Sequence, residues 1–252
     1  MNRILFEHEE ISGDGKRVTL TDHRADHIRK VLHGQAGQVI KTGEINGPCG
    51  NSVLTEINEG SVTLSPTHTE EAPEPCVDLL LALPRPKVIK RLWPQLAALG
   101  VRRIFLLNAA KVEKCYFSSQ WIDPASYRPL LIEGLTQAGT TRLPEVRVCP
   151  RLKPFMEDEA PALFRDQDVR LLAHPLPTPS ESLPRIPGGK SIPLVAIGPE
   201  GGWTPYELAL FQGLDFTLFS LGKRILRTDT ACIALLSVID FLRGSGPQKG
   251  IY

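Results

Sequence analysis

Two glycine-rich segments in the last third of the chain could bring the main chain close to a ligand. The first is Ile197-Gly-Pro-Glu-Gly-Gly202, and the second is Leu221-Gly-Lys-Arg-Ile-Leu-Arg-Thr-Asp-Thr230. Glycine lets a ligand approach the backbone and adopts angles that are closed to other residues. The second segment also carries Lys223, Arg224 and Arg227, although the net charge of the whole chain is only +1. Together the segments predict a site for an anionic or nucleotide-like ligand.

Each of these segments lies between an expected strand and an expected helix. The strands are expected at residues 192–197 and 216–220, and the helices at 205–212 and 229–242. Thr204 followed by Glu207 forms a capping box, with Pro205 at the first helical position. In open α/β sheets, ligands bind beyond the carboxyl ends of the strands. We therefore expect both segments to converge on one edge of a sheet.

The region 77–252 continues the alternation of strands and helices, which predicts an α/β domain with a mainly parallel sheet. A proline-rich span at 174–193 is expected to be a loop. The further expected elements are strands at 77–83, 103–107, 145–148 and 170–173, and helices at 87–99 and 127–139.

Residues 1–70 have a different pattern, which predicts a small β-barrel domain. Short β-rich runs alternate with glycine-containing turns, and one helix is expected at 22–32. The polar, proline-containing stretch 67–75 is expected to be a linker. The expected strands are 18–20, 38–41, 52–57 and 61–64.

Charge and composition restrict the class of protein further. Residues 1–76 have a net charge of −5 and residues 77–252 of +6, so a basic domain follows an acidic one. The apolar runs are too short to span a membrane, and the N-terminus lacks the apolar core of a secretory signal. The five cysteines contain no CxxC pair and are expected to be reduced thiols. We therefore expect a cytoplasmic protein with no membrane partner.

The sequence lacks the motifs that would indicate phosphate-binding loops, dinucleotide-binding folds or metal sites. Neither the P-loop spacing nor the dinucleotide-binding spacing is met, so kinases, NTPases and Rossmann dehydrogenases are disfavoured. His23 and His27 have helical spacing on one face, but no third ligand follows at a motif distance. No metal site is predicted.

The paired glycine segments resemble those of the SPOUT superfamily of RNA methyltransferases, and within it the RsmE family. Weaker similarity in the same order runs through residues 26–32, 99–101, 137–144 and 173–175. The resemblance implies a PUA-like RNA-binding barrel at 1–70 and a SPOUT methyltransferase domain with a trefoil knot at 77–252. It also implies S-adenosylmethionine as cofactor, N3 of a uridine in 16S ribosomal RNA as target, and a homodimer. The partner would be ribosomal RNA or the small ribosomal subunit.

The resemblance also assigns residues to the site. RNA-binding residues would be Arg29, Lys30, Arg142, Lys223 and Arg224. Cofactor-binding residues would be His174, Ile197, Gly198, Pro199, Glu200, Gly201, Gly202, Ser220, Leu221, Gly222, Ile225, Leu226, Thr228, Thr230 and Ala231.

Arg227 and Glu200 are the catalytic candidates. Methylation of uridine N3 needs removal of its proton, and a cation near the uracil oxygens would stabilise the resulting anion. Arg227, beside a helix start, suits this role, and the alternative is a structural ion pair with Glu200 or Asp229. Glu200 could be a base, but a carboxylate beside a helix start tends to stay ionised, which favours a role as a brace of the loop.

Two other functions stay open. The chain differs from the family pattern at Ala98, Thr140 and Asn108-Ala-Ala-Lys111, which lie outside the two glycine segments. These differences concern the substrate more than the cofactor. The alternatives are a SPOUT-fold RNA-binding or ribosome-assembly protein without catalysis, and a methyltransferase for a different RNA base.

Overall fold

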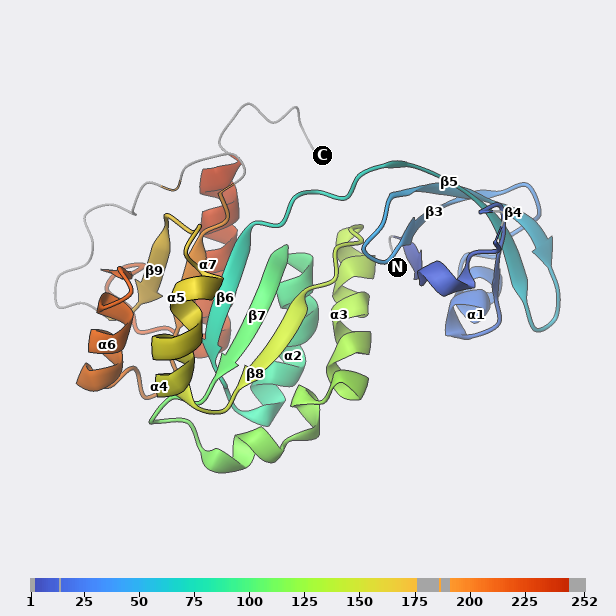
Figure 1. Cartoon of the computed structure of the whole chain (residues 1–252). Coiled ribbons are helices and arrows are strands. Elements are labelled where there is room, and N and C mark those ends of the chain that lie inside the picture. The colour runs from blue at the N-terminus through green and yellow to red at the C-terminus, as the bar shows by residue number, and fades with distance from the viewer. Residues whose placement is uncertain (1–2, 14, 176–185, 187–190, 245–252) are drawn as a thin grey trace. The chain divides into compact units, whose positions relative to one another are not determined.

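The computed structural model describes residues 3–13, 15–175, 186 and 191–244 (Figure 1). Most of the proline-rich span 174–193, expected to be a loop, lies outside these residues. The chain divides into two compact units. The N-terminal unit comprises Met1–Glu74 and Ile132–Leu143, and the C-terminal unit comprises Pro75–Leu131 and Pro144–Tyr252.

The N-terminal unit contains a mixed five-stranded sheet in the order β1-β3-β4-β5-β2. β1 and β3 are parallel, and the other neighbours are antiparallel. The short helix α1 (His23–Lys30) buries Ala25 and Ile28 in the apolar core of this unit. The strands are β1 (Ile4–Phe6), β2 (Val18–Leu20), β3 (Val39–Glu44), β4 (Cys49–Ile57) and β5 (Val62–Glu70), and a 3-10 turn, η1 (His8–Glu10), follows β1.

Two expectations for this unit were wrong. β1 was not predicted, because three apolar residues are too short a run to show the alternation of a strand. The start of the expected linker 67–75 is part of β5, which extends to Glu70. Its polar residues are held by the longer β4, because His68 lies opposite Gly50 and Glu70 opposite Cys49.

A returning segment, Ile132–Leu143, completes the N-terminal unit. The Arg3 guanidinium donates to the carbonyl of Gly139 at 3.0 Å and to that of Thr42 at 2.7 Å. Thr141 is fully buried, and its hydroxyl donates to the carbonyl of Gly47 at 2.7 Å. A Cβ at Gly43 would lie 2.6 Å from the Thr141 methyl group, so glycine is needed for this close approach. The unit is therefore discontinuous in sequence.

The C-terminal unit contains a six-stranded parallel sheet in the order β11-β9-β10-β6-β7-β8. The strands are β6 (Val77–Ala82), β7 (Val101–Leu107), β8 (Glu145–Cys149), β9 (Arg170–Ala173), β10 (Leu194–Ile197) and β11 (Thr217–Phe219). The helices are α2 (Pro86–Ala98), α3 (Pro124–Ala138, which continues into the returning segment), α4 (Leu152–Pro154), η4 (Phe155–Glu159), α5 (Ala160–Leu163), α6 (Pro205–Gln212) and α7 (Thr228–Arg243), with 3-10 turns η2 (Lys114–Ser118) and η3 (Gln120–Ile122).

Helices cover both faces of this sheet. Figure 1 shows α2 and α7 on one face and α4, α5 and α6 on the other. Every residue of β6 and β10 is buried, as expected for central strands of a parallel sheet. The α/β class with a mainly parallel sheet is therefore confirmed. Among the described residues no helix combines the length and the apolar character needed to cross a membrane.

The strand order forces the chain to cross back over the sheet. β11 lies at the edge beyond β9, whereas α7, which follows it, packs against β6 and β10. Residues 220–227 must therefore pass the carboxyl ends of β9 and β10. The trefoil knot that the resemblance implies requires a crossing of this kind.

At the amino end of the sheet, a buried carboxylate joins two strands. Asp78 of β6 is fully buried and accepts hydrogen bonds from Arg102 Nε at 2.9 Å, Arg103 Nε at 3.0 Å and Gln167 Nε2 at 2.7 Å. Burial opposes ionisation, but the bonds from both guanidinium groups hold the pKa of Asp78 below its ordinary value. The two glycine segments lie at the opposite, carboxyl end of the sheet.

Candidate functional site

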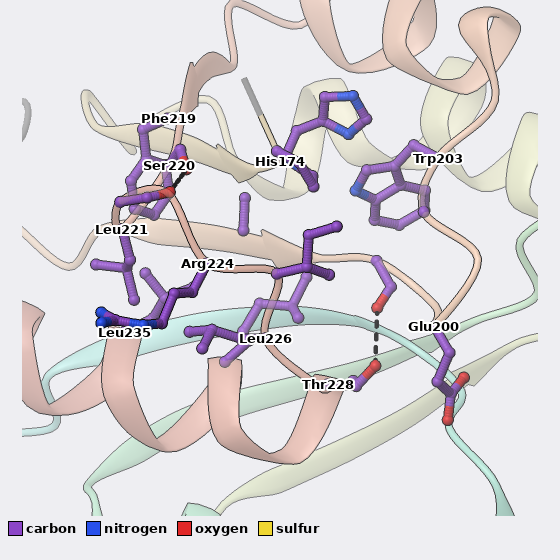
Figure 2. A pocket seen from close by; sticks show the side chains of 18 of the residues that line it. His174, Glu200, Trp203, Phe219, Ser220, Leu221, Arg224, Leu226, Thr228 and Leu235 are labelled. Carbon is purple, nitrogen blue, oxygen red and sulfur yellow. Dashed lines mark hydrogen bonds between the residues drawn. The ribbon is translucent and has the colours of Figure 1, made fainter. Parts of the chain in front are cut away.

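A cavity of about 340 Å³ lies at the carboxyl ends of β9, β10 and β11 (Figure 2). Both glycine segments predicted from the sequence contribute to its wall. Its lining consists of Ala173, His174, Pro175, Ile197, Gly198, Pro199, Glu200, Gly202, Trp203, Phe219, Ser220, Leu221, Gly222, Lys223, Arg224, Ile225, Leu226, Thr228, Ala231 and Leu235.

The first glycine segment links β10 to α6 and folds over the Trp203 indole. Gly202 has a φ of +69°, which favours glycine. A Cβ at Gly198 would lie 2.9 Å from Trp203 Nε1, so the indole packs directly on this glycine. Trp203 is buried, with its ring centre 4.8 Å from that of Phe211. It belongs to the core and lines the pocket at the same time.

The predicted start of α6 is confirmed. The Thr204 hydroxyl accepts from the Glu207 amide at 3.3 Å, and the Glu207 carboxylate accepts from the Thr204 amide at 2.7 Å. Pro205 is the first helical residue. The capping box fixes where the glycine segment ends and therefore limits the conformations open to it.

The second glycine segment links β11 to α7 and is tied to the first. Gly222 has a φ of +132°, and its carbonyl accepts from the Ser220 hydroxyl at 2.9 Å. The Thr228 hydroxyl donates to the Gly198 carbonyl at 3.4 Å (Figure 2). This contact holds the start of α7 against the first segment and closes one side of the pocket.

The loop after β7 braces the first glycine segment from behind. The buried Glu207 carboxylate accepts from the Ala110 amide at 2.7 Å. Lys111 Nζ donates to the Gly201 carbonyl at 2.6 Å, and a Cβ at Gly201 would lie 2.8 Å from Lys111 Cδ. These contacts could not be predicted from local sequence patterns, because they join residues about 90 positions apart.

Two buried polar atoms in the pocket lining have no hydrogen-bond partner among the described residues, His174 Nδ1 and Trp203 Nε1. Burial, assisted by the charge of Lys111, lowers the pKa of His174, so its imidazole is neutral near pH 7. Buried polar groups are normally bonded, so these two atoms are available to a polar ligand.

The structure brings together most of the residues assigned to a cofactor by the resemblance. All of them line the cavity except Gly201 and Thr230. Gly201 instead contacts Lys111. The residues that the sequence did not assign are mainly apolar, with Trp203, Phe219 and Leu235 as the largest.

Of the two catalytic candidates, Glu200 lines the pocket and Arg227 does not, although its neighbours Leu226 and Thr228 do. Arg227 is the N-cap residue of α7, and its side chain is 72% exposed. Its Nε lies 3.5 Å from an Asp229 oxygen, and Arg91 of α2 lies 3.1 Å from the other Asp229 oxygen. The ion pair considered as an alternative role therefore forms with Asp229. Glu200 lines the pocket, and Figure 2 shows its carboxylate directed away from His174.

The residues assigned to RNA binding are divided between the two units. Lys223 and Arg224 line the pocket. Arg29 and Lys30 lie on α1, and both pair with Asp26. Arg142 lies in the returning segment and pairs with Glu74 at 2.7 Å. The last three therefore have acidic partners within the N-terminal unit.

The chain is similar in sequence and in fold to known RNA methyltransferases. A family model described as an RNA methyltransferase domain matches residues 70–240, so the class of protein is the RNA methyltransferases. A ribosomal RNA small subunit methyltransferase E of Treponema pallidum is 30% identical over 95% of this chain and 90% of its own length. One of Borreliella burgdorferi is 28% identical over 93% of this chain and 95% of its own. The chain belongs to the ribosomal RNA small subunit methyltransferase E family.

Solved structures show the same fold. The ribosomal RNA small subunit methyltransferase E of Neisseria gonorrhoeae, bound to S-adenosyl methionine, has a TM-score of 0.72 at 20% identity and covers 98% of this chain and 100% of its own. A Legionella pneumophila protein described as a methyltransferase in complex with the same cofactor has a TM-score of 0.70 at 22% identity, covering 95% and 97%. The family expected from the two glycine segments is confirmed.

Proposed function

We propose that this protein uses S-adenosylmethionine to methylate N3 of a uridine in the 16S RNA of the small ribosomal subunit. The observation that carries the proposal is the pocket between the two glycine segments, where His174 Nδ1 and Trp203 Nε1 are buried with no hydrogen-bond partner in the part of the chain that the structure describes. The relatives' names support ribosomal RNA as substrate. The cofactor in the Neisseria gonorrhoeae structure supports the choice of methyl donor.

The lining residues fit the proposed cofactor. A cavity of about 340 Å³ is within the ordinary range for small-molecule sites. Apolar side chains such as Phe219 and Leu226 can contact an adenine ring, and the neutral His174 and the Trp203 indole can bond polar groups. Backbone groups of Gly198–Glu200, Gly202 and residues 220–226 would hold the remainder. When bound, the cofactor supplies an electrophilic methyl group on a sulfonium.

Arg227 is the residue we assign to the nucleotide. The N3 proton of uridine must leave before N3 can attack, and negative charge then spreads to the two uracil oxygens. The guanidinium of Arg227 stands at the N-terminus of α7, where the helix dipole also favours negative charge. Asp229 is shared with Arg91, so Arg227 can turn to a substrate without leaving this carboxylate unpaired.

The RNA-binding role of residues 1–70 and the homodimer belong to the same proposal. Exposed apolar side chains support self-association: Ile225, which lines the pocket, is 84% exposed, and on α7 Ile233 is 39% and Phe241 74% exposed. A second copy would cover these side chains. Light scattering coupled to gel filtration tests the dimer: a mass of about 56 kDa, twice that of the chain, is expected, and a mass of 27.8 kDa would contradict it.

Calorimetric titration with S-adenosylmethionine, with ATP and NAD as controls, tests the cofactor. Saturable binding at about one site per chain is expected. The substrate is tested by mass mapping of 16S RNA from cells that lack the gene, where one methyluridine mark should disappear and return on complementation. Binding without loss of a mark would contradict the substrate, and no binding would favour an RNA-binding protein without catalysis.

A further inference from the structure

The first half of α2 carries three exposed cations, Lys87, Lys90 and Arg91, here named the α2 cations. The helix contains no acidic residue over its whole length from Pro86 to Ala98. Its spacing places Lys87 with Lys90 and Arg91 on one face of the helix. The α2 cations therefore form a positive face that no acid on the same helix compensates.

Their position in α2 is unfavourable for the helix itself. A helix N-terminus carries partial positive charge, which favours acidic side chains in the first turns and disfavours basic ones. Lys87 makes no ion pair among the residues that the structure describes, and Lys90 lies over the Trp121 ring at 4.3 Å. The helix dipole thus disfavours the α2 cations, and only Lys90 and Arg91 have stabilising contacts in the part of the chain that the structure describes. Local conflicts of this kind often mark functional positions in proteins.

Contacts connect the α2 cations to the mouth of the pocket. Arg91 of α2 and Arg227 of α7 bind the same carboxylate, that of Asp229. Arg227 in turn follows Lys223 and Arg224, which line the pocket. The α2 cations and the three cations of residues 223–227 are thus linked through Asp229, which Arg91 and Arg227 share, and all six belong to the C-terminal unit.

We infer that the α2 cations bind the phosphate backbone of the RNA beside the nucleotide that enters the pocket. This inference rests on the proposed function, and it adds a surface on α2 to the residues that the sequence assigned to RNA. A row of flexible lysines fits phosphates, which lie in a chain of like charges and need no precise geometry. The α2 cations lie outside the cavity lining, so they hold RNA and leave the cofactor to the pocket.

The test is the double variant Lys87→Gln/Lys90→Gln. Glutamine keeps a long side chain and good helix propensity while it removes the charge. Binding of a fluorescein-labelled 20-residue oligouridylate is measured by anisotropy between 50 and 200 mM KCl, without cofactor. We expect the association constant at about 0.1 M salt to fall about tenfold. The slope of log K against log[salt] should become shallower by about 1.4, which corresponds to the loss of two single-strand phosphate contacts.

Matched controls separate charge from structure. Lys87→Arg/Lys90→Arg should bind within about twofold of the wild type, and Arg165→Gln, which removes an exposed cation elsewhere on the C-terminal unit, should leave affinity and slope unchanged. On small ribosomal subunits from the deletion strain, the glutamine variant should raise KM about tenfold with kcat and the Kd for S-adenosylmethionine unchanged.

Several outcomes would overturn the inference. Unchanged affinity and slope in the glutamine variant would remove the α2 cations from RNA binding. A fall in kcat or in cofactor affinity would assign them to the pocket. Competition by poly-L-glutamate as strong as by oligouridylate would assign the surface to an acidic protein. A wild type that binds no S-adenosylmethionine would contradict the proposed function alone, because the anisotropy measurement needs no cofactor.

Discussion

Single side chains decide how much of the pocket can be inferred without a structure. The glycines and their neighbouring cations were predicted because their chemistry lies in two short runs of sequence. The role of Lys111 was not, because its stem and ammonium contact Gly201, 90 residues away in the chain. Sequence patterns report local spacing, whereas a brace of this kind depends on which strands are neighbours in the sheet.

Lys111→Met should loosen the first glycine segment. Methionine keeps an apolar stem against Gly201 but cannot donate to its carbonyl, so we expect the affinity for S-adenosylmethionine to fall about five- to tenfold, as for loss of one charged hydrogen bond. Lys111→Arg should largely restore it. Lys114→Met, a charge-matched change nearby, is the control, and calorimetry is the measurement. Equal affinities of the Lys111→Met variant and the wild type would show that the contact is not needed.

Arg227→Ala should abolish methyl transfer while the protein stays folded. The guanidinium is 72% exposed, so its loss removes little packing, and we expect the single-turnover rate to fall by at least about a hundredfold. Arg227→Lys keeps the charge without the fork of donors and should retain an intermediate rate. Cofactor affinity, measured in parallel, should change little. A variant with full rate would remove Arg227 from the chemistry.

For helices and strands, the presence of local sequence signals decided which elements could be predicted. The α6 start was predicted to the residue because a capping box and a proline coincide there. The stretch from α4 through η4 to α5 was missed, because Pro154 and Pro161 interrupt the helical pattern and tertiary packing of Phe155 and Met156 maintains the helix nonetheless. Propensity alone could not report that packing.

Asp78 of β6 pairs with Arg102 and Arg103 of β7 at the amino end of the sheet, and removal of its charge should destabilise the fold. Asp78→Asn leaves Arg102 and Arg103 without their buried counter-ion, and we expect the free energy of unfolding to fall by about 3 kcal/mol. Urea denaturation measures it. Asp166→Asn, which changes an exposed carboxylate with a partner at 3.6 Å, should cost less than about 0.5 kcal/mol. Similar losses in the two variants would contradict a buried role for Asp78.

At the scale of the whole molecule, the two-domain α/β character followed from the rhythm of strands and helices, but the path of the chain did not. General rules of topology disfavour crossings such as that of residues 220–227, so the knot came only from the resemblance. The discontinuous N-terminal unit was likewise hidden, because nothing local marks residues 132–143 as part of it. Connectivity of this kind is a property of long-range contacts.

Mild acid should destabilise the fold through its histidines. Burial lowers the pKa of His27, His68 and His174 below the ordinary 6.5, so between the lowered values and 6.5 the unfolded chain binds more protons than the folded one. Stability therefore falls as the pH drops through this window. Thermal unfolding should give a lower Tm at pH 5.5 than at pH 7.5.

A matched pair of variants assigns part of this effect. His68 stacks on Phe6 and bonds the Thr42 hydroxyl at 2.8 Å, so His68→Gln should lower the Tm at pH 7.5 and narrow the gap between the two pH values. Asn58→Gln, an exposed change in the same unit that involves no titratable group, should leave that gap unchanged. A gap that His68→Gln does not alter would place the acid sensitivity elsewhere.

The returning segment has a consequence for how such proteins can exchange parts. Because Thr141 and Gly139 complete the N-terminal unit, the gene encodes that unit in two pieces. Residues 75–131, which include β6 and β7 of the C-terminal unit, lie between them. A chimaera that swaps only residues 1–74 between relatives would join a foreign Gly43 and Arg3 to a native Thr141. Recombination that exchanges this unit between relatives should therefore move both pieces together. Residues 1–74 and 132–143 should accordingly share one evolutionary history.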